Sequence, residues 1–177
     1  FVRRPPGITL FPYTTLFRSA STTFIDHRKS FFPEDNVYIG HHNYLEASGS
    51  IRIGRGCQIT NYVSVLTHST HNSIRYYDVA PGGERTQGYV RASVEIGPYT
   101  FIGPHTVVMP GTRIGKGCIV AAFSYLDGDY PAFSILKGTP ARIVGDTRKK
   151  DAKVLSKDPS IQSFYESWAG ISYKSFN

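Results

Sequence analysis

The 177-residue sequence has little cysteine, little charge and no long apolar run. Its two cysteines are too few for a disulfide scaffold, which favours a reducing, cytoplasmic location. No apolar run approaches the roughly 18–20 residues that a membrane span needs, so we expect no membrane span. Charged residues make up 19% and apolar residues 40%, which excludes a disordered or collagen-like chain. The length predicts one domain with a sizeable core.

Part of the net charge of +7 lies in the first nineteen residues. Residues 9–19 read TLFPYTTLFRS, which resembles the in-frame translation of a short-read sequencing adapter. On this interpretation residues 1–19 are a non-native segment and stand outside fold reasoning. Arg3, Arg4 and Arg18 lie there without an acidic residue, so subtracting three from +7 leaves +4 for residues 20–177. The remaining basic residues are scattered without an aromatic stripe, so we expect no nucleic-acid partner.

An aliphatic side chain recurs at every sixth position near the middle of the chain, which indicates an internal repeat. A helix would place apolar residues three or four apart, and an isolated strand would alternate for one short run. Glycine and proline mark the corners, where glycine adopts positive φ without steric penalty. The period of six therefore predicts short strands joined by tight turns and wound into triangular coils. The repeating residues are Ile96, Ile102, Val108, Ile114, Val120 and Leu126.

A second block of hexads lies upstream, at Ile53, Ile59 and Val65. The stretch between the two blocks has no hexad, and a long irregular insertion in a solenoid is typical of a functional loop. The predicted parts are an N-terminal remnant at 20–33, a β-helix at 34–145 with a projecting loop at 66–93, and a helical extension at 146–177.

Two short helices are predicted in the C-terminal extension. Asp146 or Thr147 caps the first helix, and Asp158-Pro159 opens the second with proline at its first position. The apolar residues of the second helix recur at helical spacing, which indicates a packing face rather than a ligand site. They are Ile161, Phe164, Tyr165 and Trp168.

The hexads resemble those of the left-handed parallel β-helix acyltransferases, the hexapeptide-repeat transferases. The segment from Val94-Glu-Ile-Gly97 to Gly138-Thr-Pro-Ala-Arg142 is similar to the C-terminal coils of that family. The stretch Val63-Ser-Val-Leu-Thr-His68-Ser-Thr-His71 is similar to the active-site loop of its polysaccharide O-acetyltransferase branch. The resemblance implies an all-β solenoid with left-handed winding and acetyl-CoA-dependent O-acetyl transfer to a carbohydrate hydroxyl. It also implies a homotrimer with active sites between subunits.

The resemblance places the general base at a histidine that follows a threonine, where the solenoid gives way to its loop. Histidine suits this role because it titrates near neutrality. Alignment with the Thr-His-Pro form of the sugar acetyltransferases favours His71, with His68 as the alternative. Backbone N–H groups would stabilise the oxyanion that forms when the acceptor hydroxyl attacks the acetyl carbonyl. Pro104 lacks an N–H at a position that donates in relatives, which leaves His105 or the partner subunit as the donor.

The resemblance also assigns binding residues. By position, Ala122 meets the pantetheine arm of acetyl-CoA through its backbone, and Lys137 and Arg142 approach the phosphates. Asn43 and Glu46 lie in the early coil where relatives bind the acceptor sugar. Ordinary corner roles are the alternative for both residues.

Two other functions fit the same architecture. A γ-type carbonic anhydrase would bind zinc between subunits through a trio such as His68, His71 and His105. That family's pair of histidines four residues apart is absent from the later coils, so we expect no metal. A non-catalytic scaffold is the other alternative, because fold does not determine function. Pro104, and Asp127-Gly128 where relatives carry Thr-Lys, favour the scaffold.

Overall fold

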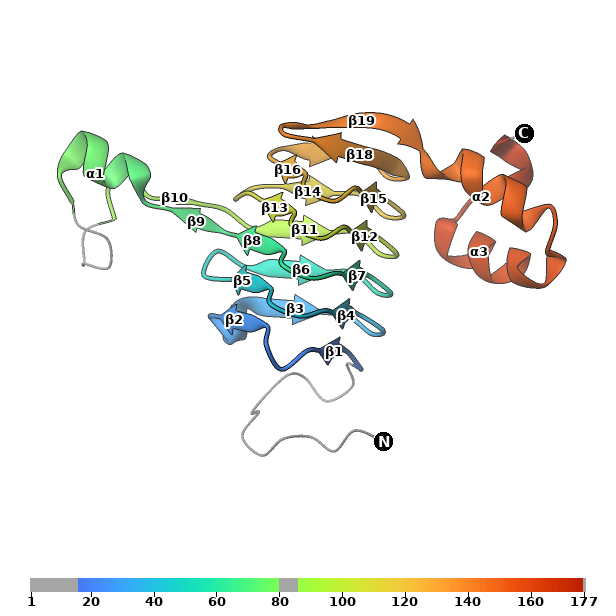
Figure 1. The fold of residues 1–177 in the computed structure, drawn as a ribbon, viewed down its shortest axis with the longest axis horizontal. Helices are drawn as coiled ribbons and strands as arrows, with labels where there is room; N and C mark the ends of the chain where they lie inside the picture. Colours follow the sequence, from blue (N-terminus) through green and yellow to red (C-terminus); the bar gives the residue numbers. More distant parts are fainter. Residues whose placement is uncertain (1–15, 80–85, 177) are drawn as a thin grey trace.

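The computed structural model describes residues 16–79 and 86–176, which wind into a parallel β-helix with three sheets (Figure 1). Sheet A contains β1 (Arg18–Ser19), β4 (Tyr38–Ile39), β7 (Gln58–Ile59), β12 (Phe101–Ile102), β15 (Ile119–Val120), β18 (Ser134–Gly138) and β19 (Ala141–Asp146). Sheet B contains β2 (Phe24–Asp26), β5 (Tyr44–Glu46), β8 (Ser64–Leu66), β13 (Val107–Val108) and β16 (Tyr125–Leu126). Sheet C contains β3 (Phe31–Pro33), β6 (Ile51–Ile53), β11 (Val94–Ile96), β14 (Arg113–Ile114) and β17 (Asp129–Tyr130).

The aliphatic residues of the hexads form the core between the three sheets. Parallel pairing places Ile59, Ile102 and Val120 above one another in sheet A, and all three are fully buried. The compact positions are buried too, and the Thr100 hydroxyl donates to the Gly115 carbonyl at 3.0 Å. The predicted all-β solenoid is therefore confirmed, because the period of six in the sequence is the period of inward-facing positions in the coil.

The β-helix begins before the predicted boundary at residue 34. The strand β1 pairs with β4, β2 with β5 and β3 with β6, all in parallel register. Ile25 and Phe31 fill the core positions below Leu45 and Ile51. They are six residues apart, but a single pair is too short a run to indicate a repeat. The predicted remnant at 20–33 is thus a coil of the solenoid. Residues 1–15 of the predicted non-native segment lie outside the described residues.

In the predicted loop at 66–93, the described residues 66–79 and 86–93 form an arm that projects from the corner between sheets B and C (Figure 1). The strands β9 (His68–Ser69) and β10 (Val90–Arg91) pair antiparallel at its base. The helix α1 (His71–Tyr77) follows β9 and carries the arm away from the coils. The antiparallel pair holds both ends of the arm against the solenoid.

The chain leaves the solenoid through the hairpin of β18 and β19, the antiparallel pair at the last coil. The helical segments that follow are, in chain order, α2 (Thr147–Leu155), the 3₁₀ turn η2 (Pro159–Ile161), α3 (Gln162–Ala169) and the 3₁₀ turn η3 (Tyr173–Phe176). A further 3₁₀ turn, η1 (Arg28–Ser30), lies between β2 and β3. The Asp146 carboxylate caps α2 by accepting from the Arg148 N–H at 2.9 Å.

The helix α3 packs on the corner between sheets C and A. The Trp168 ring lies 4.5 Å from the Tyr99 ring centroid and 5.9 Å from that of Phe133. Tyr165 is buried, whereas Phe164 is 60% and Ile161 38% exposed. The packing face of α3 therefore centres on Tyr165 and Trp168, and the Phe164 ring meets Tyr99 edge to face at 6.0 Å between centroids. Ile161 lies in η2, before α3 begins. Among the described residues, no helix has the length and apolar character needed to cross a membrane.

Replacing a core aliphatic residue tests the solenoid packing. We expect Ile102→Ala to lower the free energy of unfolding by about 3 kcal/mol, because it leaves a cavity at a fully buried position. Ile119→Ala is the matched control, since Ile119 lies on the outer face of sheet A and is 38% exposed. Urea denaturation of both variants measures the difference, and equal losses would contradict this account of the core.

Candidate active site

The corner between sheets B and C brings together polar groups from three successive coils. Asp26 ends β2, Glu46 ends β5, and Thr67 and His68 follow β8. Parallel register places Asp26 beside Glu46 and Glu46 beside Leu66. The arm leaves the solenoid at this same corner, so the candidate site lies where the regular coil is interrupted.

Glu46 is the central group of the corner and is only 2% exposed. Its Oε2 accepts hydrogen bonds from the Nδ1 of His68 at 2.8 Å and the backbone N–H of Thr67 at 3.1 Å. The Thr67 hydroxyl lies 2.8 Å from the same oxygen. Its Oε1 accepts from the Ser48 N–H at 2.8 Å. A buried carboxylate with this many donors is held in one orientation.

The hydrogen bonds keep Glu46 ionised despite its burial. Burial alone would raise the pKa of this carboxyl group, because the charged form is costly away from water. The bonds from Ser48, His68 and Thr67 favour the charged form and outweigh burial, so the pKa of Glu46 falls to about 2. Glu46 is therefore a fixed negative charge beside His68 at neutral pH.

The geometry sets the tautomer of His68. An ionised carboxylate only accepts hydrogen bonds, so the Nδ1 of His68 carries the proton that it donates to Glu46. The Nε2 of the neutral ring then has a free electron pair, and the side chain is 38% exposed. Arg91, opposite His68 in the arm, donates to the Ser48 carbonyl and ties the arm to the corner. A histidine oriented by a buried carboxylate is the arrangement expected of a general base.

His71 has a different environment. It is the first residue of α1, is exposed, and has its Nδ1 2.7 Å from the Ser69 hydroxyl. Within the described part of the chain, no carboxylate pairs with it. The sequence-based preference for His71 over His68 stays a prediction, and the geometry favours His68.

The residues predicted to bind the acceptor sugar have structural contacts instead. The Asn43 side chain is 2% exposed, and its amide donates to the carbonyls of Gly40 and Thr60 and accepts from the Val63 N–H. Its hydrogen-bonding groups are therefore used within the coil, which is the corner role named above as the alternative to sugar binding. Glu46 is 2% exposed and its carboxylate faces the His68 ring rather than solvent.

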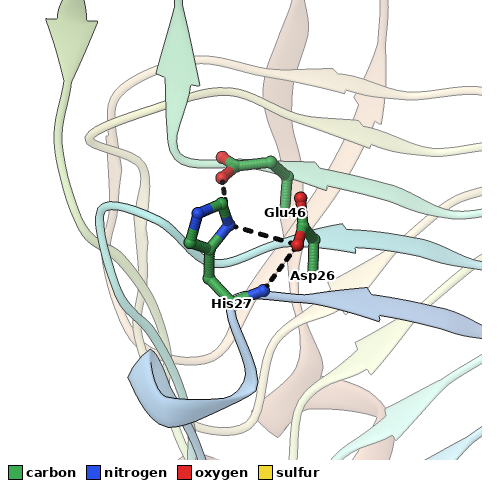
Figure 2. A group of neighbouring side chains, drawn as sticks. All are labelled: Asp26, His27 and Glu46. Carbon is green, nitrogen blue, oxygen red and sulfur yellow. Dashed lines mark hydrogen bonds and ion pairs between the residues drawn. The ribbon is translucent and has the colours of Figure 1, made fainter. Parts of the chain in front are cut away.

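Asp26, His27 and Glu46 form a second cluster at the same corner (Figure 2). The His27 Nδ1 lies 3.3 Å from Asp26 Oδ1 and 3.6 Å from Glu46 Oε1. The three ligand atoms lie within 4.8 Å of one another, so this is the group that could hold a metal ion. The trio His68, His71 and His105 is not brought together in this way among the described residues. The sequence did not predict this cluster, and His27 was not a candidate. Asp26 and Glu46 are twenty residues apart, which is not a multiple of six, so the hexad spacing does not place them side by side.

The corner between sheets A and B carries the predicted coenzyme-binding positions. The N–H groups of Ala121 and Phe123 donate to the carbonyls of Leu136 and Pro104, whereas the N–H of Ala122 makes no backbone hydrogen bond among the described residues. Ala122 is exposed and its N–H is available to a ligand. The N–H of His105 donates to the Asn61 carbonyl at 3.2 Å, so it does not replace the donor missing at Pro104.

Lys137 and Arg142 lie opposite each other on the hairpin of β18 and β19. Both are exposed, and neither forms an ion pair within the described residues. Two adjacent uncompensated cations suit a phosphate ligand. A broad groove of about 770 Å³ lies elsewhere, along sheet C, and contains none of the predicted site residues.

Comparison with known proteins identifies the repeat. Residues 93–128 match the family described as bacterial transferase hexapeptide (six repeats). A protein of Mycobacterium tuberculosis provisionally named as an acetyltransferase is 31% identical over 112 residues, which cover 62% of this chain and 35% of that protein. WbbJ of Escherichia coli, provisionally named as a lipopolysaccharide biosynthesis O-acetyl transferase, is 31% identical over 118 residues, 64% of this chain and 59% of WbbJ. The predicted hexapeptide-repeat resemblance is confirmed, and the chain spans between about a third and three fifths of these relatives.

Solved structures show the same fold. A hexapeptide-repeat-containing acetyltransferase of Vibrio cholerae aligns with a TM-score of 0.61 at 22% identity, over 75% of this chain and 70% of that one. A variant of AntD, an N-acyltransferase of Bacillus cereus in complex with dTDP and coenzyme A, aligns with a TM-score of 0.63 at 15% identity, over 78% and 85%.

The low pKa of Glu46 predicts a pH dependence of stability. The pKa is about 2 in the folded chain against an ordinary value of 4.5, so the ionised carboxylate stabilises the fold above pH 4.5. This contribution is lost as the pH falls towards 2. Between pH 5 and pH 3 the wild type should lose about 2 kcal/mol more stability than Glu46→Gln. Urea denaturation at the two pH values measures this, and parallel losses would contradict the assignment.

Proposed function

We propose that this protein is an acetyl-CoA-dependent O-acetyltransferase that acts on a carbohydrate hydroxyl, with His68 as the general base. The observation that carries the proposal is the 2.8 Å hydrogen bond from His68 to the buried carboxylate of Glu46, at the corner where the arm begins. The O-acetyl transferase name of WbbJ and the coenzyme A complex of AntD support the substrate classes. A polysaccharide or its precursor is the acceptor that this comparison favours.

The proposed reaction is a direct transfer. The Nε2 of His68 takes the proton of the acceptor hydroxyl as its oxygen attacks the thioester carbonyl of acetyl-CoA. Glu46 holds the ring in the required tautomer and stabilises the imidazolium that forms. The tetrahedral intermediate then collapses, expels the coenzyme A thiolate and leaves the acetyl group on the acceptor oxygen; the thiolate takes the proton from His68.

The coenzyme is proposed to lie along the corner between sheets A and B. The free N–H of Ala122 donates to the pantetheine arm, and Lys137 and Arg142 bind the phosphates. This corner and the His68 corner lie at opposite ends of the sheet B strands, which are two or three residues long. A strand rises about 3.3 Å per residue, so the length of one sheet B strand, roughly 7–10 Å, separates the proposed base from the coenzyme corner.

This separation favours a site assembled from two chains. His68 of one chain would face the coenzyme corner of a neighbour, which is the arrangement of a homotrimer with active sites between subunits. A neighbouring chain would also supply an oxyanion donor that Pro104 and His105 of one chain do not provide.

Separate replacement of the two histidines tests the assignment of the base. We expect His68→Ala to lower kcat/KM by about 10²–10⁴-fold, because general base catalysis is lost. His71→Ala should retain nearly full activity, since no carboxylate of the described residues orients this exposed side chain. Thiol release from acetyl-CoA in the presence of a panel of defined glycans measures both.

If His71→Ala lost more kcat/KM than His68→Ala, the result would contradict the assignment and identify His71 as the general base. Absence of thiol release by the folded wild type across the panel would contradict the enzyme and favour the non-catalytic scaffold. Circular dichroism of each variant controls for loss of fold.

Mixing two inactive variants tests the shared site. One chain carries His68→Ala, and the other carries both Lys137→Ala and Arg142→Ala. If each site takes its base from one chain and its coenzyme corner from the next, random mixed trimers should recover about a quarter of the wild-type sites. Acetyl transfer is measured after joint refolding, and no recovery would place both corners of a site on one chain.

A further inference from the structure

Four rings stack in a column along the corner between sheets A and B. The rings of His42, Tyr62, His105 and Phe123 are separated by 5.0, 4.9 and 4.7 Å between centroids, and their planes lie within 17° of parallel. All four residues adopt left-handed φ angles of 57–59°, one on each successive coil. The register of the coils therefore places the same corner residue of each coil directly above that of the coil before. At this corner position the four aromatic side chains stack face to face.

The column ends at Phe123. Parallel register of β15 and β18 places Leu136 above Val120, so the position above Phe123 belongs to Thr139. The Thr139 hydroxyl donates to the Phe123 carbonyl at 3.1 Å, which agrees with this register. Thr139 has no ring, and Phe123 is 68% exposed. One face of the Phe123 ring contacts His105, and the other has no ring partner among the described residues.

The hairpin that carries Thr139 also carries positive charge. Thr139 is in the turn of the β18–β19 hairpin, and the same hairpin carries Lys137 and Arg142 directly opposite each other. An open aromatic face, together with two cations on the adjoining hairpin that form no ion pair with any described residue, matches a ligand that joins a flat base to phosphates.

We propose that the open face of Phe123 binds the adenine ring of acetyl-CoA, which stacks as the next ring of the column. This inference rests on the proposed function and adds to it a residue that recognises the nucleoside, which neither Ala122 nor the two cations would do. Stacking on a ring suits adenine because every base has a π-face. The column orders the Phe123 ring before the ligand arrives, so little side-chain freedom is lost on binding.

Replacement of Phe123 tests the site with three ligands, two that contain adenosine and one that lacks it. We expect Phe123→Leu to weaken binding of adenosine 3′,5′-bisphosphate by about tenfold, because an aliphatic side chain cannot stack on the base. Phe123→Trp should restore binding. The KM for acetyl-CoA should rise by about the same factor in Phe123→Leu, whereas the KM for acetyl-phosphopantetheine, which lacks the adenosine, should not change.

Phe164→Leu is the matched control, because Phe164 is 60% exposed and lies on α3 at another corner. It should bind the bisphosphate as the wild type does. Unchanged affinity in Phe123→Leu, or an equal loss in Phe164→Leu, would overturn the proposal. Isothermal titration calorimetry with the bisphosphate needs no turnover. A chain that binds it through Phe123 but transfers no acetyl group would support this site and contradict the proposed function.

Discussion

The parallel register of successive coils is the constraint on which the rest of the structure depends. Each coil places its strands directly on those of the coil below, so equivalent positions form columns. Inward columns hold aliphatic residues such as Ile59, Ile102 and Val120, which form the core. Outward columns are formed by the side chains at equivalent corner positions of successive coils. The ring column at the A–B corner and the polar group at the B–C corner both result from this stacking.

The buried carboxylate of Glu46 shows how a repeating scaffold can hold chemistry. Glu46 lies at the end of a regular strand, where its backbone is fixed by the coils on either side. His68 belongs to the arm that interrupts the repeat, so its position is set by the arm and by the carboxylate together. A rigid carboxylate on the coil and a histidine on the insertion form a pair that the rest of the described solenoid does not repeat.

The hexads made most of the fold predictable, because their period of six is the period of inward-facing positions in a triangular coil. The first coil, at residues 18–33, was not predicted as solenoid, because Ile25 and Phe31 form only one pair at a spacing of six. The residue that pairs with the hexad residue Ile53 is Pro33, which is not aliphatic. The helix cap at Asp146 was predictable from local chemistry. The exposure of Phe164 was not, because it depends on how α3 packs against the corner of the coil.

Residue spacing along the chain was enough to locate the repeat, its inward residues, the arm and the two histidines at the start of the arm. Which of these histidines has a carboxylate behind it follows from the contacts between coils, because Glu46 and His68 are separated by one coil of chain and meet through parallel pairing. The same contacts between coils satisfy Asn43 within the coil and place Phe123 at the end of a column of rings. Contacts between coils depend on register, and register is set by the length of every corner and insertion between them, which spacing along the chain does not show.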